Sequence, residues 1–138
     1  MPARDLVHEA IKNALIKDGW IITDDPLILR FGDEPIYVDL GAEKVIGAEK
    51  ANQKIAVEVK SFLSPSFAAD FHLAIGQYIN YQIALREAQP ARVLYLAVPR
   101  RTYSQHFARK LVQLVIEQQH IKFIVFDDKQ ELITVWHN

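Results

Sequence analysis

The clearest hydrophobic pattern in the chain is the alternation over residues 55–60, which read Ile-Ala-Val-Glu-Val-Lys. A period of two predicts a β-strand, because successive side chains of a strand point to opposite faces. The aliphatic residues then share one face, and Glu58 stands beside Lys60 on the other. Residues 36–40 alternate in the same way and place Asp39 opposite their aliphatic side chains. The pattern therefore predicts two strands, each with an acid on the face away from its aliphatic residues.

Three stretches repeat apolar residues at the three-and-four spacing of an amphipathic helix. They are residues 4–18, which Gly19 ends, residues 65–87, which Pro90 closes, and residues 104–119. Ser64 is the expected N-cap of the second helix, with Pro65 in its first turn. Gly76 lies inside this helix, where glycine costs about 1 kcal/mol relative to alanine. Close packing or the close approach of a ligand would offset that cost.

Shorter apolar runs predict the remaining strands, at residues 20–23, 27–31, 93–98, 121–126 and 132–136, the last of them an edge strand. Gly41 is expected to end the strand that carries Asp39. Residues 42–51 leave two alternatives open, a short helix or a strand over residues 45–50 that turns back at Asn52-Gln53.

The order of these elements is helix, a block of strands, helix, strand, helix, strand, strand. Strand–helix–strand crossovers that follow an antiparallel block give a mixed sheet flanked by helices. Residues 99–101, Pro-Arg-Arg, are expected to form a basic loop after an interior strand. The sequence thus predicts one α/β domain that spans residues 1–138.

Composition excludes several classes of protein. With 138 residues the chain is long enough to bury a core, and it has no cysteine, which excludes a disulfide scaffold and a thiolate zinc site. No apolar run approaches the ~20 residues of a membrane span, and the N-terminus does not have the pattern of a signal peptide. These features suit a cytoplasmic protein. The net charge of −1 gives no bulk support to nucleic-acid binding, so a nuclease of this composition would have to gather its basic residues at a cleft.

Asp39, Glu58 and Lys60 have the chemistry of a metal site. Two carboxylates that converge at the edge of a sheet can hold Mg²⁺ or Mn²⁺, which prefer oxygen ligands. The metal would lower the pKa of a bound water and neutralise charge on a phosphate, and the lysine would orient that water. The ordinary alternative is an exposed ion pair between Glu58 and Lys60, worth under about 1 kcal/mol.

Together with Gly76-Gln77-Tyr78 on the second predicted helix, these residues resemble the PD-(D/E)XK nuclease superfamily and its restriction-endonuclease-like fold. Over essentially its whole length the chain is also similar to the XisH family, the element excision controlling factors associated with programmed DNA excision. The segments that carry this similarity are residues 17–20 (KDGW), 39–43 (DLGAE), 55–62 (IAVEVKSF) and 94–99 (LYLAVP).

The resemblance implies roles for particular residues. Asp39, Glu58 and Lys60 would form the catalytic triad, with the metal held by Asp39 and Glu58, and Gln77 would lie near the metal or the DNA. On the first helix the spacing of the superfamily falls on His8, with Glu9 one residue away. Glu9 lies nearly opposite the apolar stripe of this helix and His8 lies at its edge, so both stay candidates. The residue before Asp39 is valine, where the superfamily has proline.

The resemblance leaves three functions open. The first is a Mg²⁺-dependent DNA endonuclease, and a homodimer would then supply two sites for two strands. The second is a non-catalytic accessory factor that works with an XisI-like partner and a separate site-specific recombinase. The third is a toxin- or defence-type module inhibited by its partner.

Overall fold

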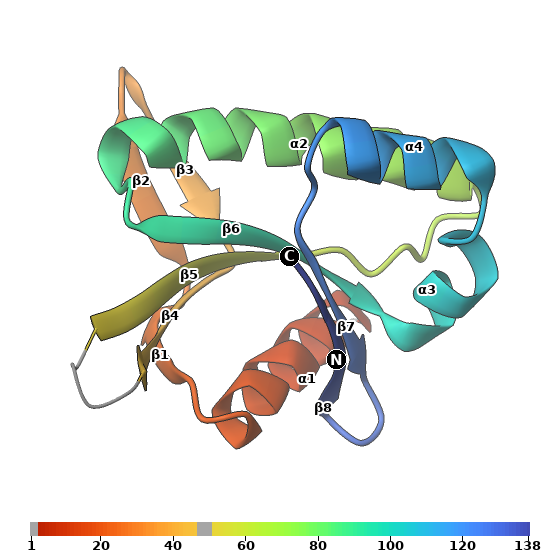
Figure 1. Ribbon diagram of the computed structural model, residues 1–138, viewed down its shortest axis with the longest axis horizontal. Helices are drawn as coiled ribbons and strands as arrows, with labels where there is room; N and C mark the ends of the chain where they lie inside the picture. The colour runs from red at the N-terminus through yellow and green to blue at the C-terminus, as the bar shows by residue number, and fades with distance from the viewer. Residues whose placement is uncertain (1–2, 47–50) are drawn as a thin grey trace.

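The computed structural model describes residues 3–46 and 51–138. Its elements, in chain order, are α1 (Ala3–Lys17), β1 (Ile21–Asp24), β2 (Leu27–Phe31), β3 (Glu34–Val38), β4 (Leu40–Ile46), β5 (Ala51–Val59), α2 (Phe67–Ala88), β6 (Arg92–Pro99), α3 (Arg100–His106), α4 (Lys110–Gln118), β7 (Phe123–Asp127) and β8 (Leu132–His137) (Figure 1). Six strands form one sheet of order β1-β4-β5-β6-β7-β8, and β2 pairs with β3 in a separate hairpin.

The six-stranded sheet is mixed. β5, β6 and β7 run parallel, joined by crossovers through α2 and through α3 and α4, whereas the other neighbouring pairs are antiparallel. α1 covers one face of the sheet, and α2 and α4 cover the other (Figure 1). This arrangement confirms the predicted α/β domain with a mixed sheet flanked by helices, and β8 is the predicted edge strand.

A separate hydrophobic core lies on each face of this sheet. The core on the side of α1 contains Ile55 and Val57, and the core on the side of α2 contains Ala56. Ile55 and Val57 are fully buried, and burial of such a side chain is worth roughly 1.5–3 kcal/mol. The alternation predicted for residues 55–60 is therefore confirmed up to Val59, where β5 ends, and it places Glu58 on the face that α2 covers.

The predicted continuous strand over residues 36–40 is wrong. Val38 ends β3 in the small hairpin and belongs to the core under α2, whereas Leu40 starts β4 and belongs to the core under α1. The chain thus changes sheets at Asp39. This residue lies at the junction between two strands and is not part of a regular ladder.

Gly41 does not end a strand, because β4 continues to Ile46. Its role is to leave space: a Cβ at this position would lie 2.8 Å from Asp24 Oδ2 and 3.1 Å from Arg92 Nη1. Arg92 also pairs with Asp24 at 3.0 Å. The glycine therefore allows a buried arginine to reach across the sheet to the edge strand β1.

The region of residues 42–51 is strand wherever the structure describes it, and residues 47–50 lie outside the described residues. The predicted turn at Asn52-Gln53 is wrong, since both residues pair with β4 inside the ladder of β5. Antiparallel pairing between β4 and β5 continues up to Ile46 and Ala51 and favours the extended backbone over the helical alternative.

Two helix boundaries also differ from the prediction. The N-cap of α2 is Ser66, whose hydroxyl accepts a hydrogen bond from the Ala69 N–H at 3.2 Å, while the Ser64 hydroxyl accepts one from the Ser66 N–H. The predicted helix over residues 104–119 is two helices, and its first turn replaces the expected basic loop. Arg109 has an extended backbone (φ −63°, ψ 142°) that interrupts the helix between α3 and α4.

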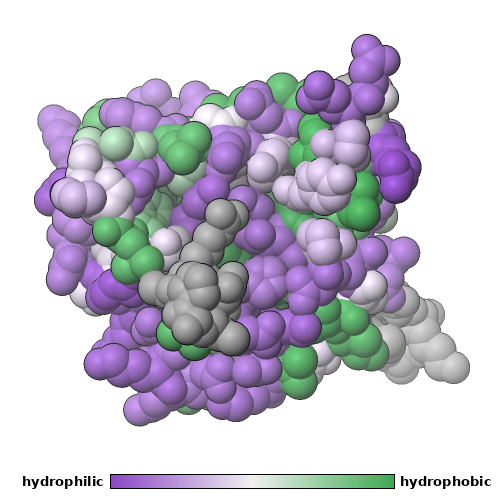
Figure 2. Space-filling view, turned by 180° about the vertical axis from the view of Figure 1, so that it is seen from behind, coloured by the Kyte–Doolittle hydropathy of each residue, from purple (hydrophilic) through white to green (hydrophobic). Residues whose placement is uncertain are grey.

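The surface is mostly hydrophilic on the side seen in Figure 2, with hydrophobic residues in separate patches. No helix among residues 3–46 and 51–138 is both long and apolar enough to cross a membrane.

Candidate functional site

The candidate site is a cleft of about 310 Å³ between α1, the end of β5 and α2. Its lining includes His8, Asp39, Lys60, Ser61, Leu73 and Gln77. The acidic and basic groups of the cleft come from the ends of strands. Asp39 lies between β3 and β4, and Lys60 directly follows β5. The cleft therefore gathers residues that are far apart in the sequence.

The carboxylates of Asp39 and Glu58 each accept a hydrogen bond from a main-chain N–H at or beside the other residue. Glu58 Oε1 accepts a hydrogen bond from the Asp39 N–H at 3.2 Å, and Asp39 Oδ2 accepts one from the Val59 N–H at 2.8 Å. The regular ladder between β4 and β5 stops at the pair Leu40–Val57. Carboxylates thus take the place of strand carbonyls there, which satisfies N–H groups that would otherwise lack partners.

Lys60 completes this group. Its Nζ lies 3.4 Å from Glu58 Oε2, and its backbone N–H donates to the Ala97 carbonyl at 3.0 Å, which anchors the residue directly after β5. The Glu58 side chain is only 7% exposed and the Lys60 side chain 20%. The pair is therefore a largely buried one, and the alternative of an exposed surface ion pair does not describe it.

Burial, and then the negative charge of Asp39, raise the pKa of Glu58 to about 7, against the opposing effect of Lys60. A carboxyl group with this pKa exchanges its proton near neutral pH. Perturbed groups of this kind, in a cleft beside a specific charge partner, are typical of functional sites.

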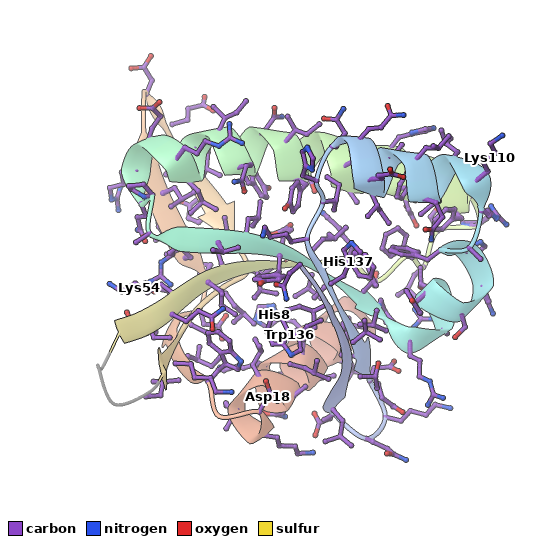
Figure 3. All side chains as sticks on the ribbon, viewed as in Figure 1. His8, Asp18, Lys54, Lys110, Trp136 and His137 are labelled. Atoms are coloured by element: carbon purple, nitrogen blue, oxygen red, sulfur yellow. The ribbon has the colours of Figure 1, made fainter. Side chains whose placement is uncertain are left out.

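His8 and Glu9 of the first helix lie in different environments. His8 lines the cleft (the residue is labelled in Figure 3), and its Nε2 lies 2.8 Å from Asp25 Oδ1. Lys12 Nζ donates to the other oxygen of Asp25 at 2.7 Å. Glu9 is exposed on the surface of α1. Of the two first-helix candidates, the structure brings only His8 to the cleft.

Gln77 faces the same cleft from α2, and its Oε1 is buried without a hydrogen-bond partner among the described residues. A buried amide oxygen of this kind calls for a ligand or water. Gly76, beside it, is exposed, and a Cβ built there would meet nothing within 4 Å. The described part of the chain thus gives no packing reason for this glycine.

The donor set suits a hard divalent cation. Among the residues that the structure describes, no group of three or more histidine or acidic side chains could hold a metal. Asp39 and Glu58 would supply two carboxylates, and Gln77 lines the same cleft as Asp39. Mg²⁺ is commonly bound by one or two carboxylates while it keeps several waters, so these residues fit Mg²⁺ or Mn²⁺.

Two residues at this site carry no signal in the sequence. Asp25 belongs to an Asp-Asp-Pro turn, yet it binds His8 across 17 residues. Arg101 Nη2 donates to the Ser61 carbonyl at 2.8 Å and fixes the loop that follows Lys60. Both contacts depend on how distant elements pack, so no local pattern could have identified them.

Comparison with known proteins gives consistent results. The family model for XisH protein matches residues 1–134. An XisH family protein from Nostoc punctiforme PCC 73102 is 45% identical, with a TM-score of 0.88, over 97% of this chain and 100% of that chain. An FDXN element excision controlling factor protein from Anabaena variabilis is 47% identical, also with a TM-score of 0.88, over 98% of this chain and 100% of that chain. The curated proteins gave no significant match.

Proposed function

Since the chain belongs to the XisH family, we propose that it controls DNA element excision through a metal-dependent phosphodiesterase site of the PD-(D/E)XK type. The observation that carries this proposal is the mutual clamp between Asp39 and Glu58, with Lys60 Nζ 3.4 Å from the Glu58 carboxylate. Asp39 and Lys60 line the cleft, and the buried Glu58 contacts both residues from behind them. Two carboxylates and a lysine are the groups that phosphodiester hydrolysis requires.

Asp39 and Glu58 would hold Mg²⁺ or Mn²⁺, and Gln77, which lines the same cleft, would lie near the metal or the DNA. When bound, the metal would supply an activated water and neutralise charge that develops on the phosphate. Lys60 Nζ would donate hydrogen bonds to the attacking water or to a phosphate oxygen, where a fixed cation stabilises the transition state. His8, held by Asp25, would bind a second group of the substrate from the opposite wall.

The test is a cleavage assay on branched and linear DNA with Mg²⁺ or Mn²⁺. We expect Lys60→Ala to lower the rate by a factor of about 10² to 10³, the usual cost of removing one fixed donor that stabilises the transition state. Lys54→Ala is the matched control, because Lys54 lies on β5, the strand that Lys60 directly follows. Lys54 forms an ion pair with Glu43 at 3.6 Å and does not line the cleft. Cleavage by the Lys60→Ala protein at the wild-type rate would come from a contaminant.

A second function, a non-catalytic accessory factor, is supported by a different observation. Leu73 and Ile83 on α2 and Leu111 on α4 are each more than half exposed, at 57%, 51% and 58%. Exposed apolar side chains on the helices that cover one face of the sheet suit binding to a protein, such as an XisI-like partner, a recombinase or a second copy of the chain. If the Lys60→Ala protein still controls excision in cells, this function is the correct one.

A further inference from the structure

A second cleft, of about 350 Å³, lies on the α1 face of the sheet, away from the candidate catalytic residues. It forms because α1 ends at Lys17 and leaves part of the sheet uncovered. Gly19, with φ +95°, then turns the chain into β1. Asp18 lies at its border, ten residues or roughly 15 Å along the helix direction from His8. Figure 3 shows Asp18 and Trp136 on this side of the sheet.

Three aromatic side chains form the floor of this second cleft. The rings of Trp20 and Trp136 are 5.7 Å apart at an interplanar angle of 32°, and Tyr95 meets Trp136 edge-on at 5.1 Å. Trp20 and Tyr95 are buried, while Trp136 is half-buried. The floor is therefore a rigid aromatic platform, of which the Trp136 ring is the part most open to a ligand.

The rim is polar and partly fixed by hydrogen bonds. Lys44 and Gln53 are a cross-strand pair of β4 and β5 whose side chains line the cleft. Lys44 Nζ donates to the Asp18 carbonyl at 2.8 Å and lies 5.7 Å from the centre of the Trp20 ring. Asn138 accepts a hydrogen bond from the Tyr95 hydroxyl. Asp18 Oδ2 lies 4.0 Å from Lys44 Nζ and accepts a hydrogen bond from Trp20 Nε1 at 3.2 Å. A lysine, an aspartate and two amide side chains thus surround the aromatic floor.

We propose that this second cleft binds an unpaired nucleobase. Aromatic platforms beside basic groups are how proteins bind single-stranded nucleic acid, since every base has a face that stacks. The amides of Gln53 and Asn138 can both donate and accept along a base edge, and Lys44 can pair with the attached phosphate. An aliphatic ligand would cover these polar groups without satisfying them. The volume falls within the range of about 300–1,000 Å³ that small ligands occupy.

The base can come from a free nucleotide or from an unpaired position in a DNA strand, and the chemistry of the cleft is the same for both. Binding here does not require the phosphodiesterase site, because none of its residues lines this second cleft. The two proposals can therefore fail separately.

Intrinsic fluorescence gives a direct test, because both tryptophans of the chain line this cleft. The full chain, in EDTA to prevent cleavage, is titrated with a single-stranded oligothymidylate, an abasic strand of the same length and thymidine monophosphate. We expect saturable quenching by the oligothymidylate and none by the abasic strand. If thymidine monophosphate binds as tightly as the oligothymidylate, the natural ligand is a free nucleotide. If the monophosphate binds more weakly, the ligand is an unpaired base in a DNA strand.

Variants are measured by the anisotropy of a labelled oligothymidylate, so that loss of a tryptophan does not remove the signal. Trp136→Leu should weaken binding about tenfold, while Trp136→Phe, which keeps a stacking ring, should stay within about threefold of the wild type. Gln53→Ala, at the rim, should weaken binding by roughly threefold without loss of the circular dichroism spectrum. Lys54→Ala, which removes a charge next to Gln53 on β5 but outside both clefts, should bind like the wild type. Equal quenching by the abasic strand, or unchanged affinity in both Trp136→Leu and Gln53→Ala, would overturn the proposal.

Discussion

The side chains of Asp39 and Glu58 each bind the main chain at or beside the other residue. Glu58 Oε1 accepts a hydrogen bond from the Asp39 N–H, and Asp39 Oδ2 accepts one from the N–H of Val59, the residue after Glu58. Each carboxylate therefore fixes the position of the other. The arrangement couples the stability of the sheet edge to the geometry of the candidate site, and it leads to predictions for both.

Asp39→Ala should destabilise the fold. The Val59 N–H, which donates to Asp39 Oδ2 at 2.8 Å, would lose its acceptor, at a cost of about 1–3 kcal/mol if no water replaces it. Asp39→Asn keeps an oxygen in the same place and should lose less than half as much stability, while both variants should lose Mn²⁺ binding. Urea unfolding and titration calorimetry measure the two effects. Equal stability of Asp39→Ala and the wild type would show that the clamp contributes nothing to the fold.

Glu58→Gln should become more stable than the wild type as the pH rises. The pKa of Glu58 in the folded protein is raised to about 7 from 4.5, so the folded state binds the proton more tightly than the unfolded chain. The stability that this proton contributes is fully present below about pH 4.5 and is lost as the pH rises through about 7. Glutamine cannot ionise and avoids this loss, which amounts to a few kcal/mol at most, since one pKa unit corresponds to about 1.4 kcal/mol.

Urea unfolding of Glu58→Gln at about pH 5 and about pH 8 measures this effect as a widening difference from the wild type. Glu43→Gln is the control, because its ion pair with Lys54 is partly exposed and should be worth less than about 1 kcal/mol at either pH. A difference between Glu58→Gln and the wild type that narrows with rising pH would contradict the raised pKa.

Two glycine substitutions should have opposite effects on stability. Gly41→Ala would place a Cβ 2.8 Å from Asp24 Oδ2 and should destabilise the fold by about 1–3 kcal/mol. Gly76→Ala meets no neighbour within 4 Å in a helix and should stabilise the protein by up to about 1 kcal/mol. Thermal unfolding compares the two. If Gly76→Ala stabilises the fold but weakens DNA binding, the glycine serves the approach of the substrate; destabilisation would mean that α2 needs it for another reason.

His8→Ala should lower DNA cleavage by roughly tenfold or more, whereas Glu9→Ala should leave it unchanged. The reason is their position, since His8 lines the cleft and Glu9 is exposed on the same helix. The cleavage assay that tests Lys60→Ala measures both variants. A larger effect from Glu9→Ala would mean that the first helix faces the substrate differently when DNA is bound.

The sequence predicted the parts of the site that follow from a local period. Alternation along residues 55–60 correctly separated Ile55 and Val57 from Ala56 and Glu58, because the two faces of a strand are fixed by the extended backbone alone. Gly19 correctly marked the end of α1, where its φ of +95° suits glycine better than any other residue. The same periodicity failed at Asp39, since a change from one sheet to another leaves the alternation of residues 36–40 intact.

The sequence by itself thus determined the class of the fold, the two faces of the central strand and the residue types that could hold a metal, because these depend on neighbours along the chain. Tertiary structure alone decided that Asp39 leaves the ladder to bind the Val59 N–H, that His8 rather than Glu9 reaches the cleft, and that Asp25 holds His8. The physical reason is that each of these contacts joins residues 17 or more positions apart. Their geometry is set by how α1, the small hairpin and the large sheet pack together, which no periodic pattern records.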